Sequence, residues 1–497
     1  MSDALRFDNT SYEVKTCTLD GRSVTYRAFT GIDYCERPLH RIQKLNLFVP
    51  ECYFSGESIN GYSLKTAPIF MPNTVGGYME GPAMEPGIDM FNGNPNTAFK
   101  ALCHGYVVAA AGIRGRNTGM MTNEFFVGGQ GGPAEKEDGV PVGRAPALAV
   151  DIKAAVRYLR HNRDLIPGDC EKIITNGTSA GGALSALAGA TGNRPEYEPY
   201  LEAIGAAKER DDIFGASCYC PIHNLDHADG AYEWLFGNED TYHMMRFEMT
   251  DHGMEQHPVE GEMPESLTRL SPLLKAEFIA YLNSLGLKDE EGNLLTLDEN
   301  GRGTFEEYVK KCVMASAQKE FDTHWSAGKV GLVVPGSEVE AQAWLETENG
   351  KVTGIDWAGF VHAITRMKPT PAFDAVDLNS PECEEFGDEK VFARHFTKFS
   401  QDHSTVPSEL ADEALVRIMN PTCFIGSACN APHWRIRHGV YDRDTSLAIP
   451  VILSLLLKNQ GTDVDFFLPW GLPHSGDYDL DELFAWIDRI CTQTENA

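Results

Sequence analysis

The sequence lacks the long apolar runs and the basic leader that mark membrane and exported proteins. No apolar stretch in the 497 residues approaches the roughly eighteen that cross a bilayer. The start of the chain, Met1 to Thr10, has no basic region followed by an apolar one. We therefore expect a cytoplasmic protein with no membrane partner.

Basic residues are also scarce. The chain has 42 Lys and Arg against 72 Asp and Glu, which gives a formal charge of -30. Such a surface repels the phosphates of nucleic acids and of anionic lipids. We therefore predict no nucleic-acid partner, and the composition leaves the oligomeric state open.

The 12 cysteines show neither a metal-binding nor a disulfide pattern. They are spread along the chain, and Cys218 and Cys220 have no second Cys/His pair at zinc-finger spacing. Reduced and mostly buried thiols are the default for such a distribution. The sequence thus predicts no metal site and no cofactor.

What the sequence does contain is an alternation of strand and helix patterns. Short β-rich runs occupy 13–19, 23–30, 44–48, 67–72, 106–111, 172–176 and 213–219. Before 172–176, the residues Leu148, Ile152, Val156 and Leu159 lie on one face of a helix, with charged residues largely opposite. Strands that alternate with helices predict a largely parallel sheet.

The alternation stops for about two hundred residues and then resumes. Helical patterns predominate at 266–285, 305–321 and 411–418. Sheet-like order returns with strands at 434–440 and 464–468 and helices at 446–457 and 481–491. We interpret 223–418 as an insertion into a core formed by 1–222 and 419–497.

One stretch organises the whole chain, because it joins a predicted strand to a predicted helix through Gly177-Thr178-Ser179-Ala180-Gly181. This is the pattern of the nucleophile elbow of α/β-hydrolases. A structural serine in a loop of small residues is the alternative. The elbow predicts an α/β-hydrolase fold, with a mostly parallel central sheet flanked by helices and a large, mainly helical lid at 223–418.

The elbow requires an acid and a histidine further along the chain, in that order. Asp442 follows the predicted strand that ends at Val440, and His474 follows the last predicted strand. We predict Ser179 as nucleophile, His474 as general base and then acid, and Asp442 as the carboxylate that orients the imidazole. Asp444 competes with Asp442 for the acid position.

The oxyanion hole requires two backbone N–H donors. One is the N–H of Ala180, directly after the nucleophile. The second is expected from Gly76 or Gly77, in the glycine-rich turn that follows the strand at 67–72. An ordinary glycine turn is the alternative reading of that segment.

Three segments together resemble bacterial tannases of the type found in lactobacilli. They are the elbow at 177–182, the run Ile436-Arg437-His438-Gly439-Val440-Tyr441-Asp442-Arg443-Asp444-Thr445, and Leu472-Pro473-His474-Ser475-Gly476. The resemblance covers most of the chain. It implies a serine esterase that hydrolyses galloyl esters of hydrolysable tannins and simple gallate esters, and releases gallic acid through an acyl-enzyme.

The resemblance also implies residues that bind the substrate ring. In tannases a lysine and a glutamate of the lid and a second aspartate hydrogen-bond the three phenolic hydroxyls. The matching positions here are Lys368, Glu382 and Asp444, while Glu384 and Glu385 remain alternatives for the glutamate. A ring with three hydroxyls needs several directional polar partners of this kind.

The sequence departs from the fungal tannases, which flank the catalytic serine and histidine with cysteines. Here the flanking residues are Thr178 and Ser475, in agreement with a reduced compartment. Two functions other than gallate-ester hydrolysis are also compatible with the sequence. One is a feruloyl or general carboxylic-ester hydrolase, and the other is a non-catalytic module that binds phenolics.

Overall fold

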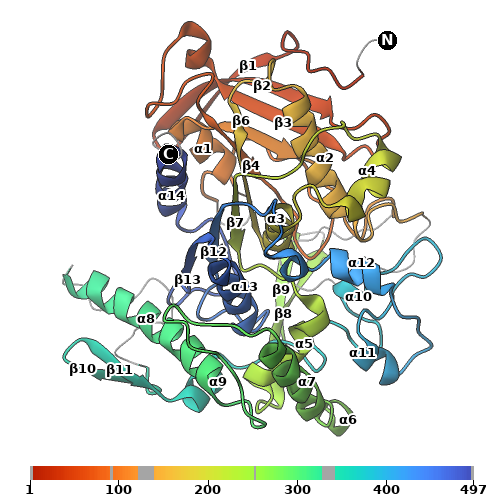
Figure 1. Cartoon of the computed structure of the whole chain (residues 1–497), viewed down its shortest axis with the longest axis vertical. Helices are drawn as coiled ribbons and strands as arrows, with labels where there is room; N and C mark the ends of the chain where they lie inside the picture. Colours follow the sequence, from red (N-terminus) through yellow and green to blue (C-terminus); the bar gives the residue numbers. More distant parts are fainter. Residues whose placement is uncertain (1–3, 90–92, 121–138, 251–252, 327–341, 494–497) are drawn as a thin grey trace.

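A computed structural model of the chain describes residues 4–89, 93–120, 139–250, 253–326 and 342–493. Its centre is a nine-stranded sheet in the order β1-β2-β3-β5-β4-β6-β7-β12-β13 (Figure 1). The strands are β1 (Glu13–Leu19), β2 (Arg22–Asp33), β3 (Lys44–Pro50), β4 (Pro68–Pro72), β5 (Val107–Ala111), β6 (Asp169–Thr178), β7 (Gly215–Tyr219), β12 (His433–Arg437) and β13 (Asp463–Phe467).

The sheet changes from antiparallel to parallel along its width. Strands β1, β2, β3 and β5 pair antiparallel to one another, whereas β5, β4, β6, β7, β12 and β13 run parallel. Every residue of β4, β5 and β7 is buried, as apolar strands covered on both faces require. The largely parallel sheet predicted from the sequence is confirmed, and the carboxyl ends of its parallel strands meet at one edge.

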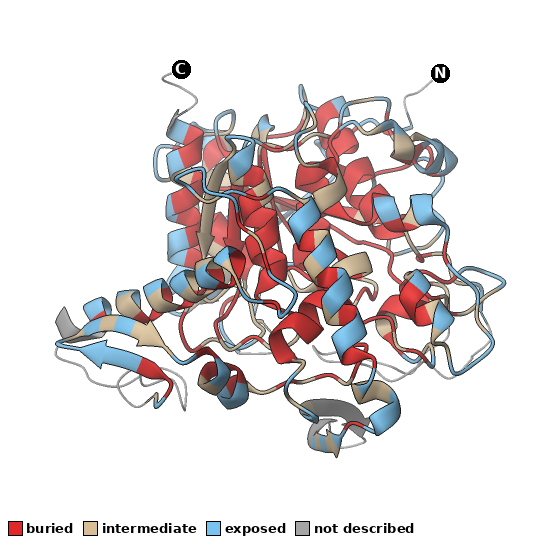
Figure 2. Ribbon diagram, turned by 60° about the horizontal axis from the view of Figure 1, so that its bottom comes forward, coloured by how far each residue is buried: buried red, intermediate tan, exposed pale blue. Residues whose placement is uncertain are grey.

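Helices cover both faces of this sheet. They are α1 (Thr97–His104), α2 (Ala147–His161), α3 (Ala180–Ala190), α13 (Ala448–Asn459) and α14 (Leu480–Gln493), and α4 (Glu198–Ile204) packs against α2. Successive residues of β7 show the two layers, because Gly215 lies against Trp486 of α14 and Ala216 lies against Gly189 of α3. Figure 2 shows the buried residues concentrated in the sheet and these helices.

Helix α2 differs from its amphipathic prediction, because its charged face is buried as well. Asp151 forms an ion pair with Arg114 at 2.8 Å. Lys153 and Arg157 both bind Asp211, at 2.8 and 2.7 Å. Opposite charges from neighbouring loops therefore replace the solvent that a charged helix face usually contacts.

The segment between β7 and β12 contains the predicted helices and two hairpins that were not predicted. Its helices are α5 (Leu225–Phe236), α6 (Glu265–Thr268), α7 (Ser271–Ser284), α8 (Thr304–Ser326), α9 (Trp357–Ile364), α10 (Pro381–Glu385), α11 (Lys398–Asp402) and α12 (Glu413–Ile418). The hairpins are β8 (Thr241–Thr250) with β9 (Gly253–Glu262), and β10 (Leu345–Glu348) with β11 (Lys351–Ile355). The core and lid boundaries at 222/223 and 418/419 stay predictions. None of the described helices is long and apolar enough to span a membrane.

The contact between α3 and the sheet gives a test of the packing. A Cβ at Gly189 would lie 2.8 Å from the Trp434 ring and 2.9 Å from the Ala216 side chain. We expect Gly189→Ala to lower the free energy of unfolding by about 1–3 kcal/mol, the usual cost of overpacking. Urea titration followed by tryptophan fluorescence measures the change.

The matched control is Gly87→Ala, because a Cβ there meets only the Glu85 carbonyl oxygen at 4.0 Å. This control should unfold within about 0.5 kcal/mol of the parent, as substitutions away from packed sites usually do. Equal midpoints for the parent and for Gly189→Ala would contradict the packing described for α3.

Candidate active site

Ser179 lies at the sharp turn between β6 and α3, as the sequence predicts. Its backbone has φ 63° and ψ -126°, a strained combination for a residue with a side chain. The turn is held by the Ser179 N–H, which donates to the Tyr219 carbonyl at 2.9 Å, and by the Ser179 carbonyl, which accepts from the Ala183 N–H at 2.9 Å. Strand β7 thus fixes the backbone of the elbow.

Small residues are required on both sides of this turn. A Cβ at Gly177 or at Gly181 would collide with the side chain of Asn73. The Asn73 amide donates to the carbonyls of Asn176 at 3.0 Å and Gly181 at 3.1 Å. The residue after β4 therefore ties the start of the glycine-rich loop to the elbow.

Asp442 and His474 are brought together from the loops that follow β12 and β13. His474 Nδ1 lies 2.8 Å from Asp442 Oδ2, and the other oxygen, Oδ1, accepts the Asp444 N–H at 2.8 Å. Asp442 is fully buried. A second imidazole, that of His438, has its Nδ1 at 3.6 Å from the same Oδ2.

Charges around this pair keep the carboxylate ionised. Burial raises the pKa of Asp442. The charges of His474 and His438 and the hydrogen bonds lower it by more than burial raises it, so the pKa lies well below the ordinary value. Burial lowers the pKa of His474, and the charges of Asp442 and Asp444 outweigh it, so the net pKa is raised. The pair is therefore an ionised carboxylate beside an imidazole that readily accepts a proton.

The outward nitrogen of His474 faces the site. Among the described residues, Nε2 has no hydrogen-bond partner, and Asp444 Oδ2 lies 3.9 Å from it. The structure thus joins Asp442 to His474 but shows no hydrogen bond from Ser179 to His474. Such bonds are often long without substrate and tighten in the complex.

The glycine-rich loop after β4 is anchored by Arg116. Gly77 has φ 54°, and its carbonyl accepts from Arg116 Nε at 3.0 Å. The Arg116 N–H donates to the Tyr78 carbonyl at 2.7 Å, and its guanidinium pairs with Glu384. Arg116, which the sequence did not single out, therefore links this loop to α10 of the inserted segment.

Lys368 and Asp444 form a close pair. The family resemblance implies that these two residues bind hydroxyls of the galloyl ring. Lys368 Nζ lies 3.1 Å from Asp444 Oδ1 and 4.0 Å from the centroid of the Phe373 ring. Lys368 is 3% exposed. Burial lowers the pKa of Lys368, and the charges of Asp444 and Glu382 raise it by more, so the lysine is a buried ammonium beside Asp444.

The three glutamates of α10 have different surroundings. Glu384 pairs with Arg116, and Glu385 is fully buried, with both carboxylate oxygens lacking a hydrogen-bond partner within the described part of the chain. Glu382 is the one whose charge couples to Lys368 and Asp444. Burial raises the pKa of Glu382 to about 7, against the lowering effect of Lys368.

Tyr232 of α5 holds the Lys368 and Asp444 loops together. Its hydroxyl accepts the N–H groups of Met367 and Lys368 at 2.9 and 3.1 Å, and donates to the Arg443 carbonyl at 2.9 Å. The ring is fully buried. Nothing in the sequence distinguishes this tyrosine from the other tyrosines among the 17 of the chain, so its place between the two loops comes from the fold alone.

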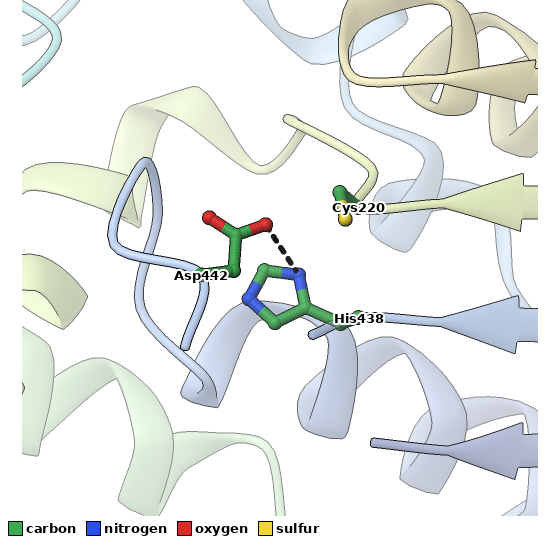
Figure 3. Close-up of side chains that lie close together, drawn as sticks. All are labelled: Cys220, His438 and Asp442. Atoms are coloured by element: carbon green, nitrogen blue, oxygen red, sulfur yellow. Dashed lines mark ion pairs between the residues drawn. The ribbon is translucent and has the colours of Figure 1, made fainter. Parts of the chain in front are cut away.

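Two buried groups of Cys, His and Asp have their potential ligand atoms within 4.8 Å of one another. One comprises Cys220, His438 and Asp442, and its side chains point toward one another at the ends of β7 and β12 (Figure 3). The other comprises Asp374, Cys383 and His395 in the inserted segment. Neither group is evident from the sequence, although Cys220 directly follows β7 and His438 directly follows β12.

The chain is similar to several known proteins. A family model described as BD-FAE matches residues 140–214, which include the elbow. The crystal structure of tannase from Lactobacillus plantarum is 45% identical with a TM-score of 0.89, over 98% of this chain and 100% of that one. Tannase from Fusobacterium nucleatum is 43% identical with a TM-score of 0.88, over 98% and 99%.

A structure of tannin acyl hydrolase in complex with ethyl gallate is 46% identical with a TM-score of 0.87, over 98% of this chain and 99% of that one. Esterase LipC of Mycobacterium tuberculosis is 46% identical over 61 residues, which is 12% of this chain and only 15% of that protein. The fold is thus that of the α/β-hydrolases. Since similarity to the tannase structures extends over nearly the whole of both chains, the protein belongs to the tannase family.

Proposed function

We propose that the protein is a serine esterase that hydrolyses galloyl esters of tannins and simple gallate esters to release gallic acid. The observation that carries the proposal is the juxtaposition of two sets of residues. The Asp442–His474 pair lies next to Lys368 and Asp444. A related tannin acyl hydrolase has been crystallised with ethyl gallate, a substrate of this class.

In the proposed reaction Ser179 Oγ attacks the ester carbonyl while His474 Nε2 takes its proton. Asp442 stabilises the resulting imidazolium through the 2.8 Å contact with Nδ1. His474 then protonates the departing alcohol, and the galloyl-enzyme remains. Water, deprotonated by His474, attacks that ester, so gallic acid leaves and Ser179 regains its proton.

The oxyanion of each tetrahedral intermediate requires N–H donors. We assign the N–H of Ala180, at the first position of α3, and that of Gly76 or Gly77. The helix N-terminus favours the negative charge. Arg116 supports this part of the site by holding the Gly77 carbonyl.

Selection of the galloyl ring is assigned to Lys368, Asp444 and Glu382. A buried ammonium and two carboxylates offer one donor and several acceptors to adjacent phenolic hydroxyls. An acyl group without those hydroxyls would leave part of the hydrogen-bonding capacity of these buried groups unused, which costs about 1–3 kcal/mol for each group left unsatisfied. These residues therefore favour gallate over acetate.

Replacing the nucleophile tests the chemistry. We expect Ser179→Ala to lower kcat for methyl gallate by a factor of about 10⁶, because triad members act as a unit. Labelling by a fluorophosphonate should be lost as well, while the circular dichroism spectrum stays that of the parent.

The matched control for this experiment is Ser475→Ala, because that hydroxyl donates to the Pro473 carbonyl at 3.1 Å and not to the site. A few per cent or more of the parent activity in Ser179→Ala would contradict the assignment of the nucleophile. So would labelling of a different serine.

Replacing the buried lysine tests ring selection. We expect Lys368→Met to lower kcat/KM for methyl gallate by about 10²-fold, equivalent to about 3 kcal/mol. For nitrophenyl acetate the change should stay within about threefold, because acetate has no hydroxyl to bind. The ratio of the two values of kcat/KM is the measured quantity.

Lys398→Met serves as the control, since Lys398 is an exposed lysine of the same inserted segment that pairs with Asp402. An unchanged gallate-to-acetate ratio in Lys368→Met would withdraw the role of Lys368 in recognising the ring.

The pKa of about 7 for Glu382 predicts a pH dependence of selectivity. As the pH falls through this pKa, Glu382 becomes protonated and loses the charge that strengthens its bond to a phenolic hydroxyl. We expect the gallate-to-acetate ratio of kcat/KM to fall about tenfold between about pH 8 and pH 5.5. Protonation of His474 affects both substrates equally and cancels in the ratio.

In Glu382→Gln the ratio should be low at both pH values and nearly independent of pH. A parent ratio that stays constant across this range would exclude Glu382 as a charged ligand of the ring. Methyl gallate and nitrophenyl acetate, assayed on one preparation, supply the data.

A further inference from the structure

The cluster of Cys220, His438 and Asp442 shares its carboxylate with the proposed reaction, whereas the Cys220 thiol and the His438 imidazole have no part in that reaction (Figure 3). Its position follows from the sheet. Cys220 comes directly after β7 and His438 directly after β12, and these strands are neighbours in register, with Tyr219 opposite Arg437. The Cys220 N–H continues the ladder by donating to the Arg437 carbonyl at 2.7 Å.

The chemistry of the three side chains is that of a soft-metal ligand set. They offer one sulfur, one imidazole nitrogen and one carboxylate oxygen, all fully or almost fully buried. Ligand atoms of a tetrahedral zinc site lie about 3.3–3.6 Å apart, as bond lengths of about 2.0–2.3 Å require. His438 Nδ1 and Asp442 Oδ2 are already 3.6 Å apart, and Cys220 Sγ is within 4.8 Å of both ligand atoms.

His438 has an unused capacity to bind. The ring is fully buried. Neither ring nitrogen makes a hydrogen bond of good geometry within the described part of the chain, and the polar neighbours of the ring are the Asp442 carboxylate, 3.6 Å away, and the Cys220 thiol. Buried imidazoles are normally bonded through at least one nitrogen. The Cys220 sulfur donates to the Ser475 carbonyl at 3.2 Å and also interacts with the imidazoles of His438 and His474.

The second cluster shows what a saturated group of the same composition looks like. His395 uses both ring nitrogens, on Asp374 at 2.6 Å and on Ser404 at 3.0 Å. Asp374 also accepts the N–H groups of Phe396 and Thr397 at 3.0 and 2.8 Å. Those bonds explain that cluster as part of the scaffold, whereas the Cys220 thiol and the His438 ring have no comparable set of hydrogen bonds within the described residues.

We propose that Cys220, His438 and Asp442 form an inhibitory site for one thiophilic divalent cation such as Zn²⁺ or Cd²⁺. Binding replaces the Sγ–H bond of Cys220 by an Sγ–metal bond and releases that proton to solvent. The thiolate and the Asp442 carboxylate then balance the two positive charges, and neutral His438 supplies the third ligand. The cation is a regulator of the site and not a resident cofactor.

The cation inhibits because it binds the same carboxylate oxygen of Asp442 that accepts the hydrogen bond of His474. Asp442 Oδ2 is the ligand atom closest to His438 and is also the acceptor for His474 Nδ1 at 2.8 Å. A cation on that oxygen competes for its lone pairs and repels the imidazolium that forms when Ser179 is deprotonated. Hydrolysis should therefore stop while the galloyl-binding residues remain in place.

The test is a titration of the purified, reduced full-length chain with Cd²⁺. We expect a thiolate-to-cadmium charge-transfer band that saturates at one ion per chain and disappears on addition of EDTA. Zn²⁺ should inhibit methyl gallate hydrolysis reversibly, and Mg²⁺, which prefers oxygen ligands, should not.

The variants are Cys220→Ala and, as the matched control, Cys218→Ala. Cys218 is a buried thiol two residues away on β7 and is not one of the three ligands. Each rate is normalised to that variant's own metal-free activity. The half-inhibitory Zn²⁺ concentration should rise at least about tenfold in Cys220→Ala, because removing even a hydrogen-bond partner of a metal ligand lowers metal affinity by about that factor. It should stay at the parent value in Cys218→Ala.

Two results would overturn the proposal. One is a cadmium band of the same size in Cys220→Ala as in Cys218→Ala, and the other is equal inhibition of both. If Cys220→Ala does not fold, alkylation of the parent followed by peptide mass spectrometry decides, because Cd²⁺ should protect Cys220 and leave Cys218 unaffected. The binding measurements do not depend on the substrate, so they stand even if gallate esters prove not to be hydrolysed.

Discussion

The arrangement depends on a carboxylate that stays charged without contact with water. Asp442 is fully buried, and an isolated ion there would cost several kcal/mol. The His474 imidazole, the nearby His438 ring and the Asp444 N–H offset that cost. The loop after β12 must therefore keep its shape, and the same shape places Asp444 beside Lys368.

The site is assembled from strand ends, which explains how residues distant in sequence act together. Ser179 follows β6, Cys220 follows β7, His438 and Asp442 follow β12, and His474 follows β13. In a parallel sheet these ends lie at one edge. The inserted segment adds Lys368 and α10 to this arrangement. Tyr232 connects Lys368 to the Arg443 carbonyl, and Arg116 connects Glu384 to the Gly77 carbonyl.

Much of this could be predicted, because the local signals agree with the fold. The run before Ser179 is apolar, the residues after it are small, and the strand–turn–helix of the elbow follows from both. Asp442 and His474 were predicted because each lies in a loop directly after one of the last two predicted strands. The hairpin of β10 and β11 could also have been predicted, because Asn349 and Gly350, which lie between its strands with positive φ, are a typical hairpin turn pair. The helical patterns around the hairpin obscured this pair.

Other features depend on tertiary contacts that no local pattern encodes. Glu382, Glu384 and Glu385 share one short helix, and only the positions of Arg116 and Lys368 distinguish them. An amphipathic α2 would expose its charged residues to solvent. Lys153 and Arg157 instead form ion pairs with Asp211, which lies more than fifty residues later in the chain. His438 and Cys220 become neighbours only because β12, from the far side of the insertion, pairs with β7.

That pairing of β7 with β12 has a consequence for synthesis of the chain. When β7 emerges from the ribosome it can pair with β6, but its other edge has no partner until His433 and the rest of β12 are made. The intervening stretch of about 210 residues takes roughly 10–40 s to translate. For that time the nascent chain presents an apolar open edge, which is a template for aggregation. Slower translation prolongs the exposure, and chaperones that cover open strand edges should improve the yield of active protein.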